Sequence, residues 1–182
     1  EKLRPGEFGV MHGYMKIPEL KRVCHAMEIS INEYLVSVYI WSVYTECLHG
    51  MPSKCPIRVA VPVNLRPYFN SITTKNFFVM VSAEFHPTKE TYTFAEVAAI
   101  VKESLRSQIN RENLEKLFSY NVSNEKLLIA RVVPLFLKNL AMKYVYTTSA
   151  LANTATITNI GNISVTEEYR PYVEMFHAFL AM

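Results

Sequence analysis

The sequence contains no aspartate, because all 16 of its acidic residues are glutamates. Any mechanism that needs an aspartate from this chain is therefore excluded, including an aspartic-protease dyad, a Ser-His-Asp triad and an EF-hand calcium loop. Glycine is also scarce: the 5 residues are scattered and form neither a G-x-G-x-x-G fingerprint nor a Walker loop. We therefore expect no glycine-rich loop that cradles a phosphate.

Cysteine and histidine are too dispersed to build a metal site. The cysteines are Cys24, Cys47 and Cys55, which form no C-x-x-C pair and no even disulfide framework, so we expect reduced thiols. No two histidines are three or four residues apart, and no H-E-x-x-H motif is present. We therefore expect no bound metal.

Long hydrophobic runs are missing as well. The most apolar stretch, 129–142, is interrupted by Arg131, Pro134 and Lys138, and the first residues lack the apolar region of a secretion signal. The formal net charge of +3 is spread along the chain and forms no basic stripe, which argues against nucleic acid as a partner. We expect a cytoplasmic protein with no membrane span.

Helix signals are clear along the 182 residues, of which 50% are hydrophobic. Ile17-Pro18 opens one helix, and the capping boxes Ser30/Glu33 and Thr93/Glu96 open two more. The second should bury Ile31, Tyr34, Leu35, Val38 and Trp41, and the third should bury Phe94, Val97, Ala98, Val101 and Leu105. Further helices are predicted over 112–120 and 124–146, the latter kinked or restarted at Pro134.

Three segments have strand patterns. Residues 57–63 alternate between apolar residues and others, and Pro62 indicates an edge strand or a bulge. Residues 77–85 are apolar on both faces, which places this strand deeper in the sheet. Residues 154–160 are rich in β-branched residues, and Gly161 follows them. The order of elements predicts the α/β class, in its α+β, two-layer form, with a mixed sheet backed by helices. The apolar end, 176–182, has no polar close. We therefore expect residues 1–182 to form a single lobe that lacks parts of its fold at both ends.

Candidate functional residues lie where these strands begin and end. Asn64 and Arg66 follow the first strand, where an arginine most often organises structure by bridging carbonyls. Asn76 precedes the second strand, a position typical of turn capping. Thr158 and Asn159 end the third, where a hydroxyl and an amide could donate hydrogen bonds to an oxyanion, although turns favour the same residues.

Taken in order, these segments are more specific. The pattern V-x-V-N-x-R over 61–66, N-F-F over 76–78 and T-N-x-G over 158–161 resembles the chloramphenicol acetyltransferase-like superfamily. It is most similar to the alcohol acetyltransferase and condensation-domain branches. Residues 28–35 also resemble the segment that opens a helix ahead of the first of these strands, and the resemblance extends from about 17 to 172.

The resemblance implies two similar lobes, each a sheet backed by helices, with a tunnel between them. The family's catalytic motif, H-H-x-x-x-D, ends the first lobe, and its second histidine is the general base on the acceptor. This sequence has neither a His-His pair nor an aspartate. It therefore resembles the C-terminal lobe only, a chloramphenicol acetyltransferase-like half-domain whose catalytic histidine comes from an N-terminal lobe, and alone it should be inactive.

The resemblance also implies roles for the candidate residues. Thr158 and Asn159 would be the catalytic polar groups near the tetrahedral intermediate, while Asn76 and Gly161 would contact substrate. Asn64 and Arg66 would be structural. The expected site residues are therefore Asn64, Arg66, Asn76, Thr158, Asn159 and Gly161. The co-substrate would be acetyl-CoA or a carrier-bound pantetheine thioester, and the acceptor a small-molecule alcohol or amine.

The leading hypothesis is the C-terminal part of a CoA (thioester)-dependent acyltransferase that transfers an acetyl group. One alternative is a condensation domain acting on carrier-bound substrates, which this part of the sequence discriminates poorly. Another is a degenerate, non-catalytic lobe that only binds a partner. A generic α/β binding module with chance motif matches remains a third.

Overall fold

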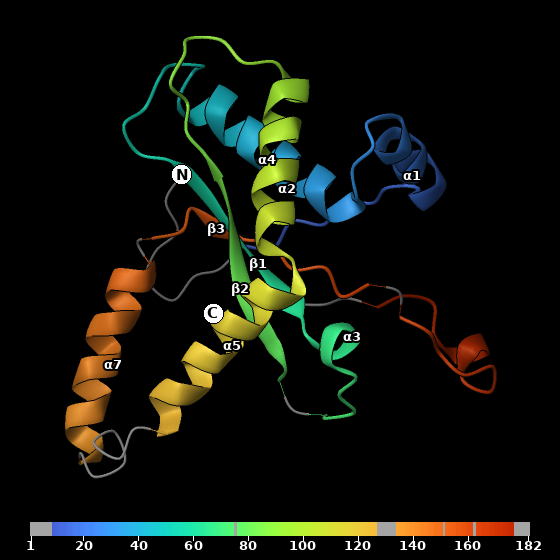
Figure 1. Ribbon diagram of the computed structural model, residues 1–182. Coiled ribbons are helices and arrows are strands. Elements are labelled where there is room, and N and C mark those ends of the chain that lie inside the picture. Colours follow the sequence, from blue (N-terminus) through green and yellow to red (C-terminus); the bar gives the residue numbers. More distant parts are fainter. Residues whose placement is uncertain (1–8, 75, 127–133, 151, 162, 177–182) are drawn as a thin grey trace.

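The computed structural model describes residues 9–74, 76–126, 134–150, 152–161 and 163–176 (Figure 1). In chain order, its elements are the helices α1 (Ile17–Ala26) and α2 (Ile31–Ser42), the π-helical turn η1 (Val43–Cys47), strand β1 (Ile57–Asn64), the short helix α3 (Arg66–Phe69), strand β2 (Phe78–Phe85), helices α4 (Phe94–Gln108), α5 (Arg111–Lys126) and α7 (Leu135–Ala150), strand β3 (Ala155–Thr156) and the 3-10 turn η2 (Arg170–Tyr172). The α+β class with a mixed sheet is confirmed.

Within the described residues, the sheet has three strands in the order β2-β1-β3. β1 and β2 are antiparallel over their whole length, from Ile57 opposite Phe85 to Asn64 opposite Phe78. β3 is parallel to β1 and much shorter than the predicted segment 154–160, since only its two residues pair, with Val59 and Ala60. The chain beyond Thr156 leaves the sheet after a last hydrogen bond from Ile157 N to Ala60 O, 2.9 Å.

The predicted positions of the first two strands in the sheet are wrong. β1 is central, although Pro62 indicated an edge or a bulge. The sheet tolerates this proline because the short β3 ends beside Ala60, before a backbone donor at Pro62 would be needed. β2 lies at the edge of the described sheet and buries alternate residues, while Phe78 and Met80 stay 48% and 43% exposed. It was expected deeper in the sheet.

Both capping boxes form, and they fix where α2 and α4 begin. The buried residues of α4 are Val97, Ala98, Val101 and Leu105, as predicted, with Phe94 half-buried. The predicted stripe of α2 is wrong: Glu33, Val36, Ser37 and Ile40 are buried, whereas Ile31, Tyr34, Leu35, Val38 and Trp41 are only half-buried. The apolar residues of α2 surround almost the whole helix, so periodicity selects no single face.

The main core lies between one face of the sheet and helices α2 and α4. Its members are fully or almost fully buried: Val36, Ile40, Tyr44, Ile57, Val59, Val61, Leu65, Val79, Val81, Ala83, Phe85, Val97, Val101, Leu105 and Leu114. Figure 1 shows α4 and α2 stacked against the upper half of β1 and β2, with α1 to one side. The lower half, where β1 ends and β2 begins, carries Asn64, Arg66 and Asn76.

The last two long helices differ in burial. α5 is longer than the predicted 112–120 and buries Leu114 in the core. α7 begins directly after Pro134, while residues 127–133, part of the predicted helix over 124–146, lie outside the described residues. The expected abrupt end falls mostly outside them too. No helix within the described ranges is both long and apolar enough to cross a membrane.

Candidate functional site

Strand direction brings the candidate residues to one end of the sheet. Asn64 ends β1, and the register pairs it with Phe78, the first residue of β2, so Asn76 precedes β2 at that same end. β3 is parallel to β1, so Thr158 and Asn159, which follow β3, lie toward the same end. The loop between β1 and β2 therefore lies at the carboxyl end of β1, and the segment after β3 runs toward that end but leaves the sheet beside Ala60.

Asn64 and Arg66 are tied together where β1 ends. Asn64 Oδ1 accepts hydrogen bonds from Arg66 N at 3.1 Å and from Arg66 Nη1 at 3.3 Å. Arg66 Nε donates to the carbonyl of Thr73 at 2.9 Å, and Leu65 N donates to Phe77 O at 3.0 Å. The two side chains thus hold the loop between β1 and β2 against the end of the sheet, which is the kind of contact that a structural role requires.

Asn76 is exposed at the mouth of β2. Its neighbour Phe77 anchors this point, because its ring packs edge-on against Phe118 at 5.2 Å and against Phe69 at 6.4 Å between centroids. These contacts hold Phe77 against α3 and α5, while Asn76 beside it is exposed.

A turn engages one of the two polar atoms of the Asn159 carboxamide. Its Oδ1 accepts a hydrogen bond from Gly161 N at 2.9 Å, and Gly161 has a left-handed φ of 80°. With the oxygen engaged in the turn, the carboxamide nitrogen remains as the donor, which is the polarity that an oxyanion needs. Nothing lies within 4 Å of where a Cβ on Gly161 would be, so glycine serves the backbone conformation there and not a close approach. Thr158 is half-buried beside this turn.

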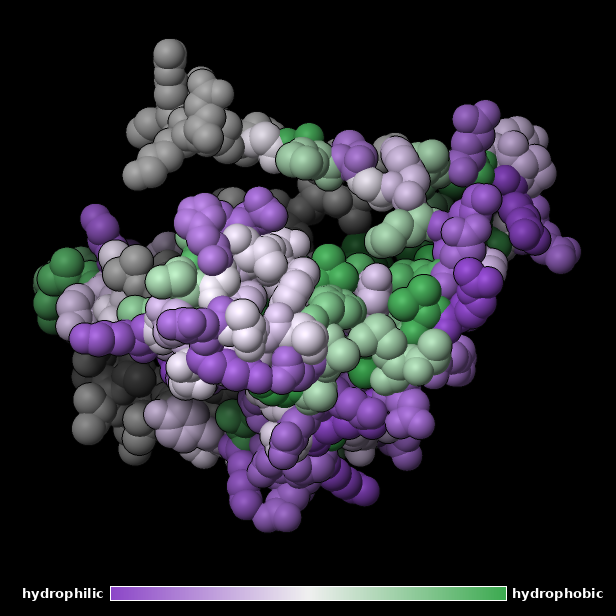
Figure 2. Space-filling view, turned by 90° about the horizontal axis from the view of Figure 1, so that it is seen from above, coloured by the Kyte–Doolittle hydropathy of each residue, from purple (hydrophilic) through white to green (hydrophobic). Residues whose placement is uncertain are grey.

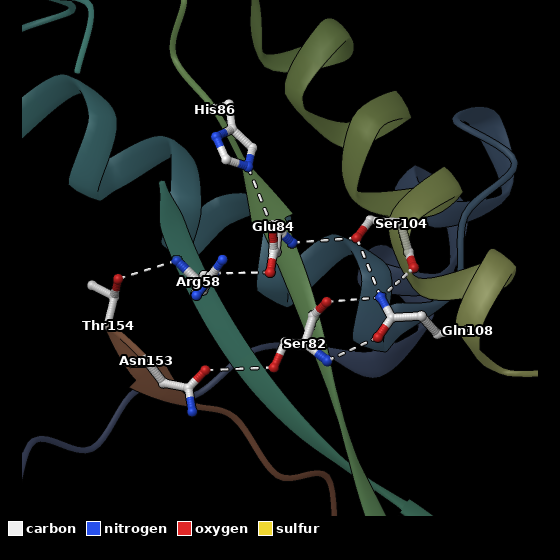
Figure 3. Close-up of polar contacts among 8 residues, drawn as sticks. All are labelled: Arg58, Ser82, Glu84, His86, Ser104, Gln108, Asn153 and Thr154. Carbon is white, nitrogen blue, oxygen red and sulfur yellow. Dashed lines mark hydrogen bonds and ion pairs between the residues drawn. The ribbon is translucent and has the colours of Figure 1, made fainter. Parts of the chain in front are cut away.

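Sequence reasoning missed a polar cluster toward the other end of the sheet (Figure 3). Glu84 lies between two basic side chains: its Oε1 is 2.8 Å from Arg58 Nε and its Oε2 is 3.3 Å from His86 Nε2. The Arg58 backbone N–H donates to Thr154 Oγ1 at 3.1 Å. Arg58 and Glu84 are directly opposite in the register, so the available signal was a pair of opposite charges at the polar positions of two alternating strands.

Two hollows in the described surface do not involve the candidate residues. One of about 500 Å³ lies beside α1 and is lined by Tyr14, Leu20, Val23 and Tyr34 among others. Another of about 360 Å³ lies in the segment 163–176. The candidate end of the sheet lines neither of them.

No cluster of three or more metal-ligating side chains occurs in the part of the chain that the structure describes. Comparison of the sequence and structure with protein-family models, with curated proteins and with solved structures found no match. The functional argument therefore rests on the residues and the topology alone.

Proposed function

We propose that this chain is the C-terminal lobe of a thioester-dependent acyltransferase, which transfers an acetyl group from acetyl-CoA to an alcohol or amine. The observation that carries the proposal is that Asn64, Arg66 and Asn76 lie at one end of the sheet, and that the segment with Thr158 and Asn159 runs toward that end because β3 is parallel to β1. The ordered motifs that resemble the chloramphenicol acetyltransferase-like superfamily are the same segments.

In the proposed reaction, the acceptor oxygen or nitrogen attacks the thioester carbonyl, and a histidine of the N-terminal lobe takes the acceptor's proton. The carbonyl oxygen becomes an oxyanion in the tetrahedral intermediate, and collapse of that intermediate expels the thiolate, which is then protonated. The amide nitrogen of Asn159 and the hydroxyl of Thr158 are donors of the kind that stabilises such an oxyanion. Asn64 and Arg66 keep the strand end in shape, and Asn76 contributes a polar group to the tunnel wall.

The exposed surface supports a second lobe. Helix α7 stands apart from the sheet, and its large apolar side chains are 45–75% exposed (Figure 1). Hydrophobic side chains also gather on the face seen from above (Figure 2). A sister lobe would cover such surfaces, and an acetyl-CoA donor suits a cytoplasmic enzyme.

Substitutions at Asn159 in the two-lobe enzyme test the oxyanion role. Asn159→Ala removes both the turn acceptor and the donor, whereas Asn159→Asp keeps an oxygen for Gly161 N, removes the donor and adds a negative charge that would repel an oxyanion. Loss of one oxyanion donor costs about 100-fold in kcat, so we expect both variants to fall at least tenfold. The control is Glu103→Ala, an exposed residue of α4 outside the candidate site, which should leave kcat unchanged.

The assay should follow the acetylated product by chromatography, because the exposed thiols of Cys47 and Cys55 would react with a thiol reagent. An Asn159→Asp enzyme with full activity would show that Asn159 serves only the turn. Acyl transfer by the present chain alone would overturn the two-lobe account. If the two-lobe protein catalyses no acyl transfer, the proposed reaction itself is refuted.

A further inference from the structure

Strand β2 has the composition of a segment that invites pairing with another chain. Its residues 78–83, Phe-Val-Met-Val-Ser-Ala, include no charge, no proline and no glycine, and the strand lies at the edge of the described sheet. Uncharged, β-prone segments on a sheet edge are templates for edge-to-edge association. The lysine or proline that commonly protects such an edge is absent from residues 78–83.

Two side chains of α4 occupy this edge instead (Figure 3). The Gln108 carboxamide accepts from Ser82 N at 3.3 Å and donates to Ser82 O at 2.8 Å. Ser104 Oγ accepts from Glu84 N at 3.2 Å. Both backbone groups of Ser82 and the N–H of Glu84 are therefore engaged by side chains rather than by a strand.

The geometry of Gln108 imitates a strand residue. In a hydrogen-bonded antiparallel pair, the N–H of each residue donates to the C=O of the residue opposite. The Gln108 carboxamide makes the same two hydrogen bonds with the backbone of Ser82. Its nitrogen donates its other proton to Ser104 O at 2.7 Å, which fixes the plane of the amide. The single carboxamide thus has the hydrogen-bonding pattern of a neighbouring strand.

The spacing of the two side chains matches the strand. Four residues along a helix rise about 6 Å, and two residues along a strand rise about 6.6 Å. Ser104 and Gln108 are four apart on α4, and Glu84 and Ser82 are two apart on β2. One helical turn is therefore in step with one repeat of the strand edge.

We propose that Ser104 and Gln108 close the edge of β2 to strand addition, and that without them a second copy of this chain pairs with that edge. The occupant is a second copy because the segment 78–83 is itself uncharged and β-prone, and identical strands of this kind pair readily in antiparallel register. The outer-face side chains Phe78 and Met80, which are 48% and 43% exposed, would extend the contact. This inference is independent of the proposed acyl transfer.

The test is the double variant Ser104→Ala/Gln108→Ala of the whole chain, compared with the unaltered chain by sedimentation velocity and by hydrogen exchange. We expect self-association to tighten at least tenfold, measured as the change relative to the unaltered chain. Adding Met80→Lys, a charge on the outer face of the edge strand, should reverse it. The matched control is Ser107→Ala, an exposed serine of the same helix that bonds only the carbonyl of Ser104.

Amide exchange distinguishes the outcomes. In the double variant at low concentration, the amides of Ser82 and Glu84 should exchange at least tenfold faster, and they should regain protection as the copies associate. Unchanged association, or association that Met80→Lys does not reverse, would overturn the proposal. If the double variant does not fold, Ser104→Ala alone decides: faster exchange at Glu84 is expected, and unchanged exchange there would refute the closure.

Discussion

The ion pair between Glu33 and Arg106 offers the sharpest test of how α2 is held on α4. Glu33 is 7% exposed, and its carboxylate accepts from Arg106 Nε at 2.8 Å and from Arg106 Nη2 at 3.2 Å. It also accepts from Ser30 N at 2.6 Å, which closes the capping box. Arg106 Nη2 reaches Glu28 O at 3.2 Å, where the backbone has a left-handed φ of 54°. The Glu33 carboxylate thus caps α2 and binds Arg106 of α4, and Arg106 also contacts the turn before α2 through Glu28 O.

Replacing Glu33 by alanine removes the cap and the charged hydrogen bonds together. Loss of a capping interaction costs about 1 kcal/mol, and loss of charge-assisted hydrogen bonds about 2 kcal/mol more, so the free energy of unfolding should fall by about 3 kcal/mol. For a chain of this size, that lowers Tm by about 6–12 °C. Arg106→Ala should cost more than Glu33→Ala, because it leaves a buried carboxylate without its cation.

The assay is urea unfolding followed by circular dichroism, with Glu112→Ala as control. Glu112 pairs with Lys116 on the exposed face of α5, where both side chains are more than two-thirds exposed, so its loss should change the midpoint little. The reasoning is refuted if Glu33→Ala lowers stability no more than Glu112→Ala does. It is also wrong if Arg106→Ala is the milder of the two substitutions in the ion pair.

The same ion pair predicts a pH dependence. Burial raises the pKa of Glu33, but the hydrogen bonds from Arg106 and Ser30 together outweigh it, so the pKa is lowered from the ordinary 4.5. A carboxyl with a lowered pKa in the folded state contributes its stability above the ordinary pKa and loses it as the pH falls through the lowered value. Between pH 7 and 5 the contribution should be constant, and it should decline below about 4.5. Glu33→Gln should remove that decline.

Two further predictions concern the loop between β2 and α4. Tyr44 is buried, and its hydroxyl donates to Gly50 O at 2.7 Å and lies 3.1 Å from Glu90 O. Tyr44→Phe should therefore lower the free energy of unfolding by about 1–2 kcal/mol in urea unfolding. No change would show that water replaces the hydroxyl. Hydrogen bonds from Lys89 and Thr93 lower the pKa of Glu96 to about 2; an NMR titration should find it there, and Lys89→Met should raise it, whereas an ordinary value in the unaltered chain would contradict the contact.

Local signals in the sequence predicted local structure well. The capping boxes Ser30/Glu33 and Thr93/Glu96 fixed two helix starts, because each is a contact between residues three apart. The inward face of α4 was also predicted, since polar residues alternate with its apolar ones. The face of α2 was not, because an almost wholly apolar helix leaves the choice to its neighbours, and the neighbours are set by tertiary packing.

Strand order is a non-local property, and there the sequence misled. Pro62 indicated an edge, but the relevant fact is how far β3 extends beside β1, which depends on residues almost a hundred positions away. The apolar character of 77–85 indicated a central strand, yet β2 lies at the edge with α4 side chains in place of a neighbour. A strand covered by a helix and a strand covered by another strand have the same composition.

The position of the candidate residues Thr158 and Asn159 depends on the polar cluster around Glu84, which was not predicted from the sequence. Thr158 and Asn159 lie toward the Asn64 end only because β3 is parallel to β1; an antiparallel β3 would carry them toward the opposite end. Besides the two paired residues of β3, the residues just before it contact β1 and β2. Thr154 exchanges hydrogen bonds with the Arg58 backbone at 2.7 and 3.1 Å, and Asn153 Oδ1 accepts from Ser82 Oγ at 3.4 Å. The polar cluster of Figure 3 therefore orients the strand that delivers the candidate oxyanion donors.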